Sequence, residues 1–77
     1  MFETMTKTGR YLGSFATLTD AVSAVNAAKI KMSDEARIRN GGKLVAKAYR
    51  LSGRTYVAIK GDDTPYSYCP FTDQIIS

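Results

Sequence analysis

The sequence predicts an α+β domain in which one principal helix packs on a small antiparallel sheet of three to four strands, in the order β-α-β-β-β. Apolar residues recur at helical spacing between Leu18 and Met32. Two strand-like segments, 43–51 and 54–60, are separated only by Ser52-Gly53, a pair typical of a tight hairpin. Hydrophobic residues make up 44% of the 77 positions, so we expect residues 1–77 to form a single folded domain.

The N-terminal segment is expected to add little to this domain. Residues 1–9 are predicted to be flexible, because 4–9 are polar and show no regular apolar pattern. Arg10 to Phe15 is predicted to form the first strand, in which Gly13 marks a bulge or a close approach of another group.

The principal helix has clear signals at its start. Thr19 is a suitable N-cap, Asp20 suits the positive end of a helix, and Leu18 is placed for a hydrophobic staple. At about 100° per residue, one face of the helix collects Leu18, Ala21, Val22, Val25, Ala28 and Met32. Ile30 lies away from this face, so either the helix ends near Lys29 or Ile30 makes a second contact.

The stretch from Ser33 to Gly41 allows two interpretations. Ser33 is a possible N-cap for a short helix that ends at Gly41. Alternatively, Ala36 to Arg39 is an edge strand that turns through Asn40-Gly41 into the next strand. The Asn-Gly pair is a strong hairpin signal and favours the second interpretation.

The second half of the chain is predicted to be an antiparallel meander. Strands 43–51 and 54–60 form its central hairpin, and the segment from Gly61 to Pro65 is a turn. Tyr66 to Cys69 is a short last strand, which Pro70 ends.

The hairpin connection predicts which side chains share a face of the sheet. A turn at Ser52-Gly53 places Leu51 opposite Arg54 and Tyr49 opposite Tyr56. One face, suited to the alanine-rich helix, then carries Leu44, Ala46, Ala48, Arg50, Thr55, Val57 and Ile59. The other face carries Lys43, Lys47, Tyr49, Arg54, Tyr56 and Lys60, together with Val45, Leu51 and Ala58.

Lysine, arginine and tyrosine interleaved on an exposed sheet face favour nucleic-acid binding. The cations neutralise phosphates, and the phenol rings stack on bases or pack against sugars. The same residues also suit a solvated sheet face without a ligand, since tyrosine forms strands well and lysine keeps a sheet soluble. Val45 and Leu51 open a third interpretation, in which the face docks on a protein through apolar anchors and a basic rim.

Composition agrees with a binding role and argues against an enzyme. The 11 Lys and Arg exceed the 7 Asp and Glu, which gives a net charge of +4 and favours a polyanionic partner, DNA or RNA. The chain has no histidine and one cysteine, so the usual general base and a tetrahedral zinc site are lacking. We therefore predict no catalytic residues, no metal, no cofactor and no small-molecule substrate.

Three weaker motifs are explained by structure alone. Asp62-Asp63 and Asn40-Gly41-Gly42-Lys43 are typical turn sequences, and Cys69 is expected to be a small buried hydrophobe.

Near Met1 there is no basic start followed by an apolar run, and no segment is long enough to cross a bilayer. These features predict a cytoplasmic protein that does not associate with membranes.

Residues 11–25, YLGSFATLTDAVSAV, resemble the last strand and helix start of the ethylene-response-factor (Apetala) DNA-binding domain, relatives of which occur in phage homing endonucleases and integrases. The matching positions, which serve mainly for packing in that family, are Leu12, Gly13, Phe15, Thr17, Ala21, Ala24 and Ala28. The family's DNA-contacting residues lie mostly on two strands before this motif, where only Arg10 matches a contact position. The resemblance covers about a fifth of the chain and implies a DNA-related role.

The predicted size and architecture are also similar to those of small phage inhibitors, including anti-CRISPR proteins. This likeness implies an alternative function, in which a phage-encoded protein acts in the host cytoplasm. It would dock on a host complex that handles nucleic acid, at a surface that holds or neighbours the nucleic acid.

Overall fold

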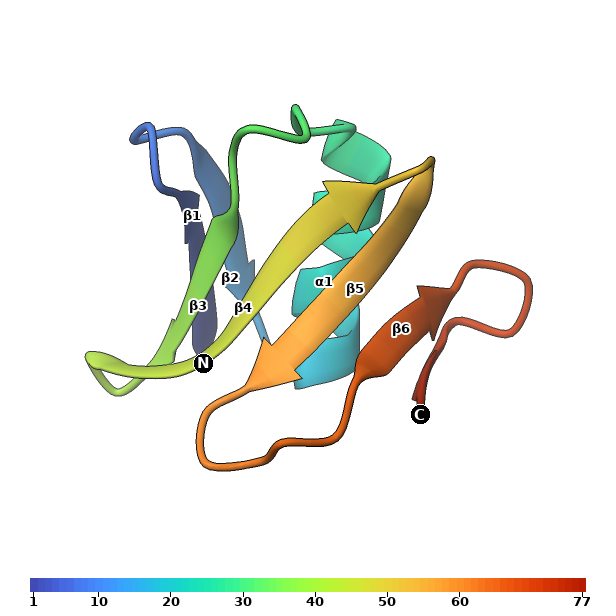
Figure 1. The fold of residues 1–77 in the computed structure, drawn as a ribbon. Coiled ribbons are helices and arrows are strands. Elements are labelled where there is room, and N and C mark those ends of the chain that lie inside the picture. The colour runs from blue at the N-terminus through green and yellow to red at the C-terminus, as the bar shows by residue number, and fades with distance from the viewer.

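The computed structural model describes residues 1–77 as one sheet and one helix (Figure 1). In chain order the elements are β1 (Phe2–Thr6), β2 (Tyr11–Phe15), α1 (Leu18–Ala28), β3 (Ala36–Asn40), β4 (Lys43–Leu51), β5 (Arg54–Ile59), β6 (Tyr66–Cys69) and β7 (Gln74–Ile76). All pairs of neighbouring strands are antiparallel, and the strand order across the sheet is β2-β1-β3-β4-β5-β6-β7.

The predicted fold class is wrong, because the protein is mostly sheet. Seven antiparallel strands replace the three to four expected, and the one helix, α1, has 11 residues. The largest change is at residues 1–9, predicted to be flexible, where β1 lies between β2 and β3. Its inward positions include Thr4 and Thr6, which are buried although polar, so this strand lacks the apolar alternation that marks a strand in sequence.

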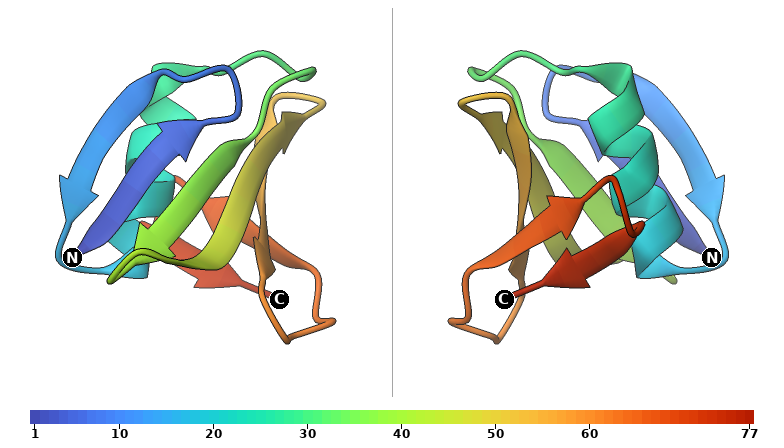
Figure 2. Two further views of the ribbon diagram at one scale, coloured as in Figure 1. Left: turned by 90° about the vertical axis from the view of Figure 1, so that its left-hand side faces the viewer. Right: turned by 90° about the vertical axis from the view of Figure 1, so that its right-hand side faces the viewer.

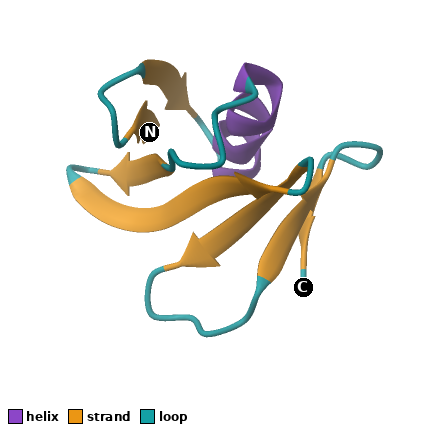
Figure 3. Ribbon diagram, turned by 45° about the horizontal axis from the view of Figure 1, so that its top comes forward, coloured by secondary structure: helices purple, strands orange, loops and turns teal.

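The sheet curls around α1, which lies on its concave side (Figure 2). Figure 3, in which the top of the molecule is tilted toward the viewer, shows the long strand curving below the helix. Small residues on both elements, Ala21 on α1 and Ala46 and Ala48 on β4, are fully or almost fully buried and allow close packing. The core consists of Ala21, Val22, Val25, Ile30, Ala36, Ile38, Ala46, Ala48, Val57 and Tyr68.

The ends of α1 differ in part from the prediction. Thr17, and not Thr19, is the N-cap, because the Thr17 hydroxyl accepts a hydrogen bond from the backbone N–H of Asp20 at 3.1 Å. The predicted end near Lys29 is confirmed, since Lys29 is the left-handed C-cap with φ of 49°. This turn directs Ile30 into the core and leaves Met32 exposed, so Met32 does not belong to the packed face.

The hairpin interpretation of residues 33–41 is confirmed, with two differences. β3 pairs with β4 through a turn at Gly41-Gly42, and not at Asn40-Gly41. Both glycines have positive φ, as a two-residue hairpin turn requires. β3 is also no edge strand, because β1 covers its other side.

The predicted register of β4 and β5 is confirmed. Lys47 pairs with Ala58, Tyr49 with Tyr56, and Leu51 with Arg54. Ser52 and Gly53 form the connecting turn with φ of 53° and 76°, values that match a tight primed turn. β6 has its predicted bounds, and the three-residue strand β7, which was not predicted, pairs with it.

Gly13 lies in the edge strand β2, where both predicted features occur. The pairing of β1 with β2 shifts by one residue between Thr4 and Met5, which is a bulge next to Gly13. A Cβ at Gly13 would lie 2.8 Å from Cζ of Phe15, and the φ of 133° itself favours glycine. The Phe15 ring therefore covers the glycine backbone on the concave side of the sheet.

Candidate nucleic-acid interface

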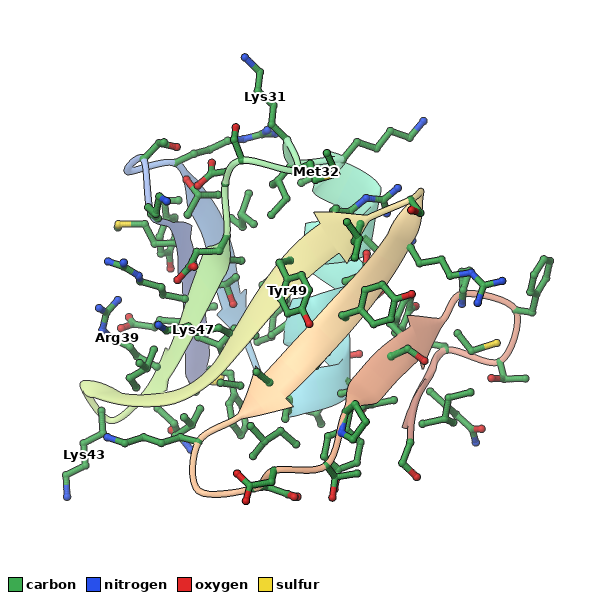
Figure 4. The ribbon with its side chains drawn as sticks, viewed as in Figure 1. Lys31, Met32, Arg39, Lys43, Lys47 and Tyr49 are labelled. Atoms are coloured by element: carbon green, nitrogen blue, oxygen red, sulfur yellow. The ribbon has the colours of Figure 1, made fainter.

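The candidate site is the convex face of the sheet, which points away from α1 and is called the outer face below. Figure 4 views this side, with Arg39, Lys47 and Tyr49 labelled on it. The part of the outer face that β1, β3, β4 and β5 form, with Lys60 directly after β5, comprises Glu3, Met5, Arg37, Arg39, Leu44, Lys47, Tyr49, Leu51, Arg54, Tyr56, Ala58 and Lys60.

Five of the six predicted site residues share this face, and Lys43 does not. The pairing of β3 with β4 skips one residue, so that Ile38 faces Ala46 and Arg39 faces Leu44. The bulge at Val45 reverses the alternation of side chains before it in β4. Leu44 therefore joins the outer face, and Lys43 lies at the end of the sheet next to the β3–β4 turn (Figure 4).

The two tyrosines form a stacked pair at the middle of the β4–β5 hairpin. The ring centroids of Tyr49 and Tyr56 are 5.7 Å apart, and the ring planes differ by 22°. Offset stacking of this kind holds both rings in place before any partner binds. Tyr49 remains 40% exposed, so its ring is available to a ligand.

β3 adds two arginines that were not predicted as site residues. Arg37 lies directly opposite Lys47, and Arg39 lies opposite Leu44. The sequence does indicate their shared face, because Arg37 and Arg39 alternate with the buried Ile38 as residues of a strand do. It was missed because residues 33–41 had two interpretations and no predicted face.

The candidate site carries an excess of positive charge. Six of the 11 cationic side chains lie on the outer face or, for Lys43, at its end, against the two glutamates, Glu3 and Glu35. The five remaining cations are matched by five aspartates elsewhere in the chain. The six cations and two glutamates of this site thus sum to +4, the same value as the net charge of the whole chain.

The glutamates neutralise part of this charge at the β1–β3 side. The Glu35 carboxylate lies 3.4 Å from Arg37 Nε and 3.6 Å from Lys47 Nζ. Glu3 lies opposite Arg39 in the pairing of β1 with β3. Both ion pairs of the molecule involve Glu35, so Arg54 on β5 and Lys60 directly after it have no carboxylate partner.

A shallow hollow of about 270 Å³ opens beside the tyrosine pair, between β4 and β5. Ala58 leaves the space, because its neighbours on this face have larger side chains. The hollow is lined by Leu44, Ala46, Lys47, Ala58, Ile59 and Lys60. It therefore combines two apolar side chains, Leu44 and Ala58, with two lysines, of which Lys47 also pairs with Glu35.

The other candidates take structural roles. The Asp62 carboxylate accepts hydrogen bonds from the Tyr66 hydroxyl at 2.7 Å and the Thr64 N–H at 2.9 Å, which lower its pKa and close the turn. Cys69 is half-buried and not buried as predicted, and a hydrogen bond from Thr72 lowers the pKa of its thiol. No three His, Cys, Asp or Glu side chains are grouped as metal ligands.

The fold and the site thus define a single-sheet domain with a basic outer face that carries a tyrosine pair. No protein-family model, curated protein or solved structure matches the chain. The resemblance of residues 11–25 to the ethylene-response-factor junction stays a prediction. The helix of this protein falls short of the length and apolarity that membrane crossing requires.

Proposed function

We propose that the protein binds nucleic acid through the outer face, as a non-catalytic cytoplasmic domain. The observation that carries this proposal is the excess of six cations over two glutamates on, or at the end of, the face that bears the tyrosine pair. Cations that neutralise phosphates supply sequence-independent affinity, and exposed rings add stacking with any base. A face that served only for solubility would not need the uncompensated cations to cluster around two aromatic rings.

Charge reversal on the outer face tests the proposal. Lys47→Glu and Arg54→Glu are each expected to weaken binding and to lower the salt slope of log K by about 1, because each removes one phosphate contact. Fluorescence anisotropy with labelled DNA and RNA at several salt concentrations measures both quantities. Neither side chain is buried, so the variants should remain folded.

Lys31→Glu is the matched control, since it changes the net charge equally at an exposed loop position off the outer face (Figure 4). It should bind almost as the unaltered protein does. If Lys31→Glu weakened binding as much as Lys47→Glu, the affinity would follow total charge and the outer face would not be the site. The absence of binding to any nucleic acid at low salt would refute the function.

Removing the carboxylate of Glu35 is expected to strengthen binding. Glu35→Gln removes one negative charge, so Arg37 and Lys47 bind phosphates without competition from the carboxylate. We expect affinity at low salt to rise by roughly threefold to tenfold. Asp20→Asn, on the helix at the opposite side of the sheet, changes the charge equally and should have a smaller effect.

A second function is favoured by the apolar side chains on the same face. Met5, Tyr49 and Leu51 are 40%, 40% and 47% exposed, as anchors for a protein partner would be. In this alternative the protein is an inhibitor, of the phage type, that docks on a host nucleic-acid-handling complex. A pull-down from host lysate separates the two functions, because only a direct protein contact survives nuclease treatment.

A further inference from the structure

The hollow at Ala58 and the tyrosine pair are neighbours on the outer face. Ala58 follows Tyr56 by two residues on β5, and its partner Lys47 precedes Tyr49 by two residues on β4. Residues at this spacing lie on the same side of a strand, about 7 Å apart. A planar group in the hollow would therefore lie beside the stacked rings, which extend the apolar surface of the hollow.

The size of the hollow restricts what it can hold. At about 270 Å³ it is smaller than the roughly 300–1,000 Å³ of pockets that enclose drug-sized molecules. On the outer face its lining side chains are those of Leu44 and Ala58, with Lys47 and Lys60 beside them, because Ala46 and Ile59 direct their side chains toward the core. One flat aromatic ring with negative groups on both sides fits this arrangement. A nucleotide within a strand meets this description, since its base has an aromatic face and its sugar has a phosphate on each side.

Double-stranded nucleic acid fits the same surface poorly. In a duplex the bases are stacked and paired, so none can enter the hollow without being flipped out. The outer face is convex because the sheet curls around α1, and two convex surfaces share little contact area (Figure 2). Glu3 and Glu35 further confine an approaching polyanion to the side of the face formed by β4 and β5.

We propose that the outer face recognises single-stranded nucleic acid, with one unpaired base in the hollow over Ala58 and its flanking phosphates on Lys47 and Lys60. This inference rests on the function proposed above and names the form of nucleic acid that is bound. Stacking against the tyrosine pair makes recognition tolerant of base identity, since every base has an aromatic face.

The test fills the hollow without changing charge. Ala58→Leu places a larger apolar side chain in the space, and Ala58→Ser is the control that keeps the space open. Ala58 is exposed, so both variants should remain folded, which circular dichroism checks. The probes are single-stranded DNA and RNA, an abasic strand of the same length that keeps the phosphates, and the corresponding duplex.

The unaltered protein and Ala58→Ser are expected to bind the single strands about tenfold or more tightly than the abasic strand and the duplex. Ala58→Leu is expected to lose this preference while it retains the affinity for the abasic strand. Equal or tighter binding of the duplex or of the abasic strand by the unaltered protein would overturn this inference and leave the proposed function standing. A preserved preference in Ala58→Leu would overturn the placement of the base, and a failure to bind any probe would reject the proposed function itself.

Discussion

Replacing Ile38 with alanine is expected to remove a large part of the protein's free energy of unfolding. Ile38 is fully buried in β3, where it pairs with Thr4 of β1 and Ala46 of β4. Loss of a buried isoleucine side chain costs about 2–5 kcal/mol, which includes the cavity left behind. Small domains have free energies of unfolding of about 5–15 kcal/mol, so this loss is a large part of the total.

Urea denaturation followed by circular dichroism measures this effect. Ile76→Ala is the matched control, because Ile76 is 46% exposed in β7 and its truncation should change the free energy of unfolding by less than about 1 kcal/mol. The comparison also tests the position of β3 in the sheet. If β3 were an edge strand, Ile38 would be half-exposed and its replacement by alanine would have a small effect. An equally small effect at both positions would contradict the central place of β3.

The second large effect is expected at Asn26, which joins α1 to the β4–β5 hairpin. Its Oδ1 accepts hydrogen bonds from Arg50 Nη1 at 2.7 Å and from the Thr55 hydroxyl at 2.9 Å. Arg50 also donates to the carbonyl of Gly53 at 3.2 Å, in the connecting turn. This network ties the helix to the end of the hairpin that presents Arg54.

Asn26→Ala should lower the free energy of unfolding by about 1.5–3 kcal/mol, because it leaves the Thr55 hydroxyl and the Arg50 guanidinium with fewer partners. Gln74→Ala, at an exposed amide in β7, is the control and should have little effect. In a double-mutant cycle with Thr55→Val, a coupling energy of about 0.5–3 kcal/mol is expected. Independent effects of the two substitutions would show that the network does not act as a unit.

The Asn26 network also relates stability to the proposed function. The tyrosine pair and Arg54 lie near the Ser52-Gly53 turn, which Arg50 holds through its bond to Gly53. Loosening the turn would leave these side chains less ordered before a ligand binds. The free energy needed to order them would then lower the affinity for the ligand. We therefore expect Asn26→Ala to accelerate hydrogen exchange in the hairpin at temperatures where the domain remains folded.

Most of the outer face could be predicted because its geometry follows from one turn. Ser52-Gly53 sets the pairing of β4 with β5, and strict alternation then places Lys47, Tyr49, Arg54 and Tyr56 on one side. Lys43 could not be placed in this way, since the bulge at Val45 depends on pairing with β3. The place of Arg37 on the outer face could not be predicted either, because it depends on the pairing of β4 with β3.

Local chemistry therefore determined the elements whose signals lie within a few residues: the helix, the β4–β5 hairpin and the short strand β6. The extent of the sheet depended on contacts between distant segments. β1 shows no apolar alternation, and it becomes a strand because β2 and β3 satisfy its backbone hydrogen bonds on both sides. The same long-range pairing buries Thr4 and Thr6 and brings Arg37 next to Lys47, which no periodicity in the chain encodes.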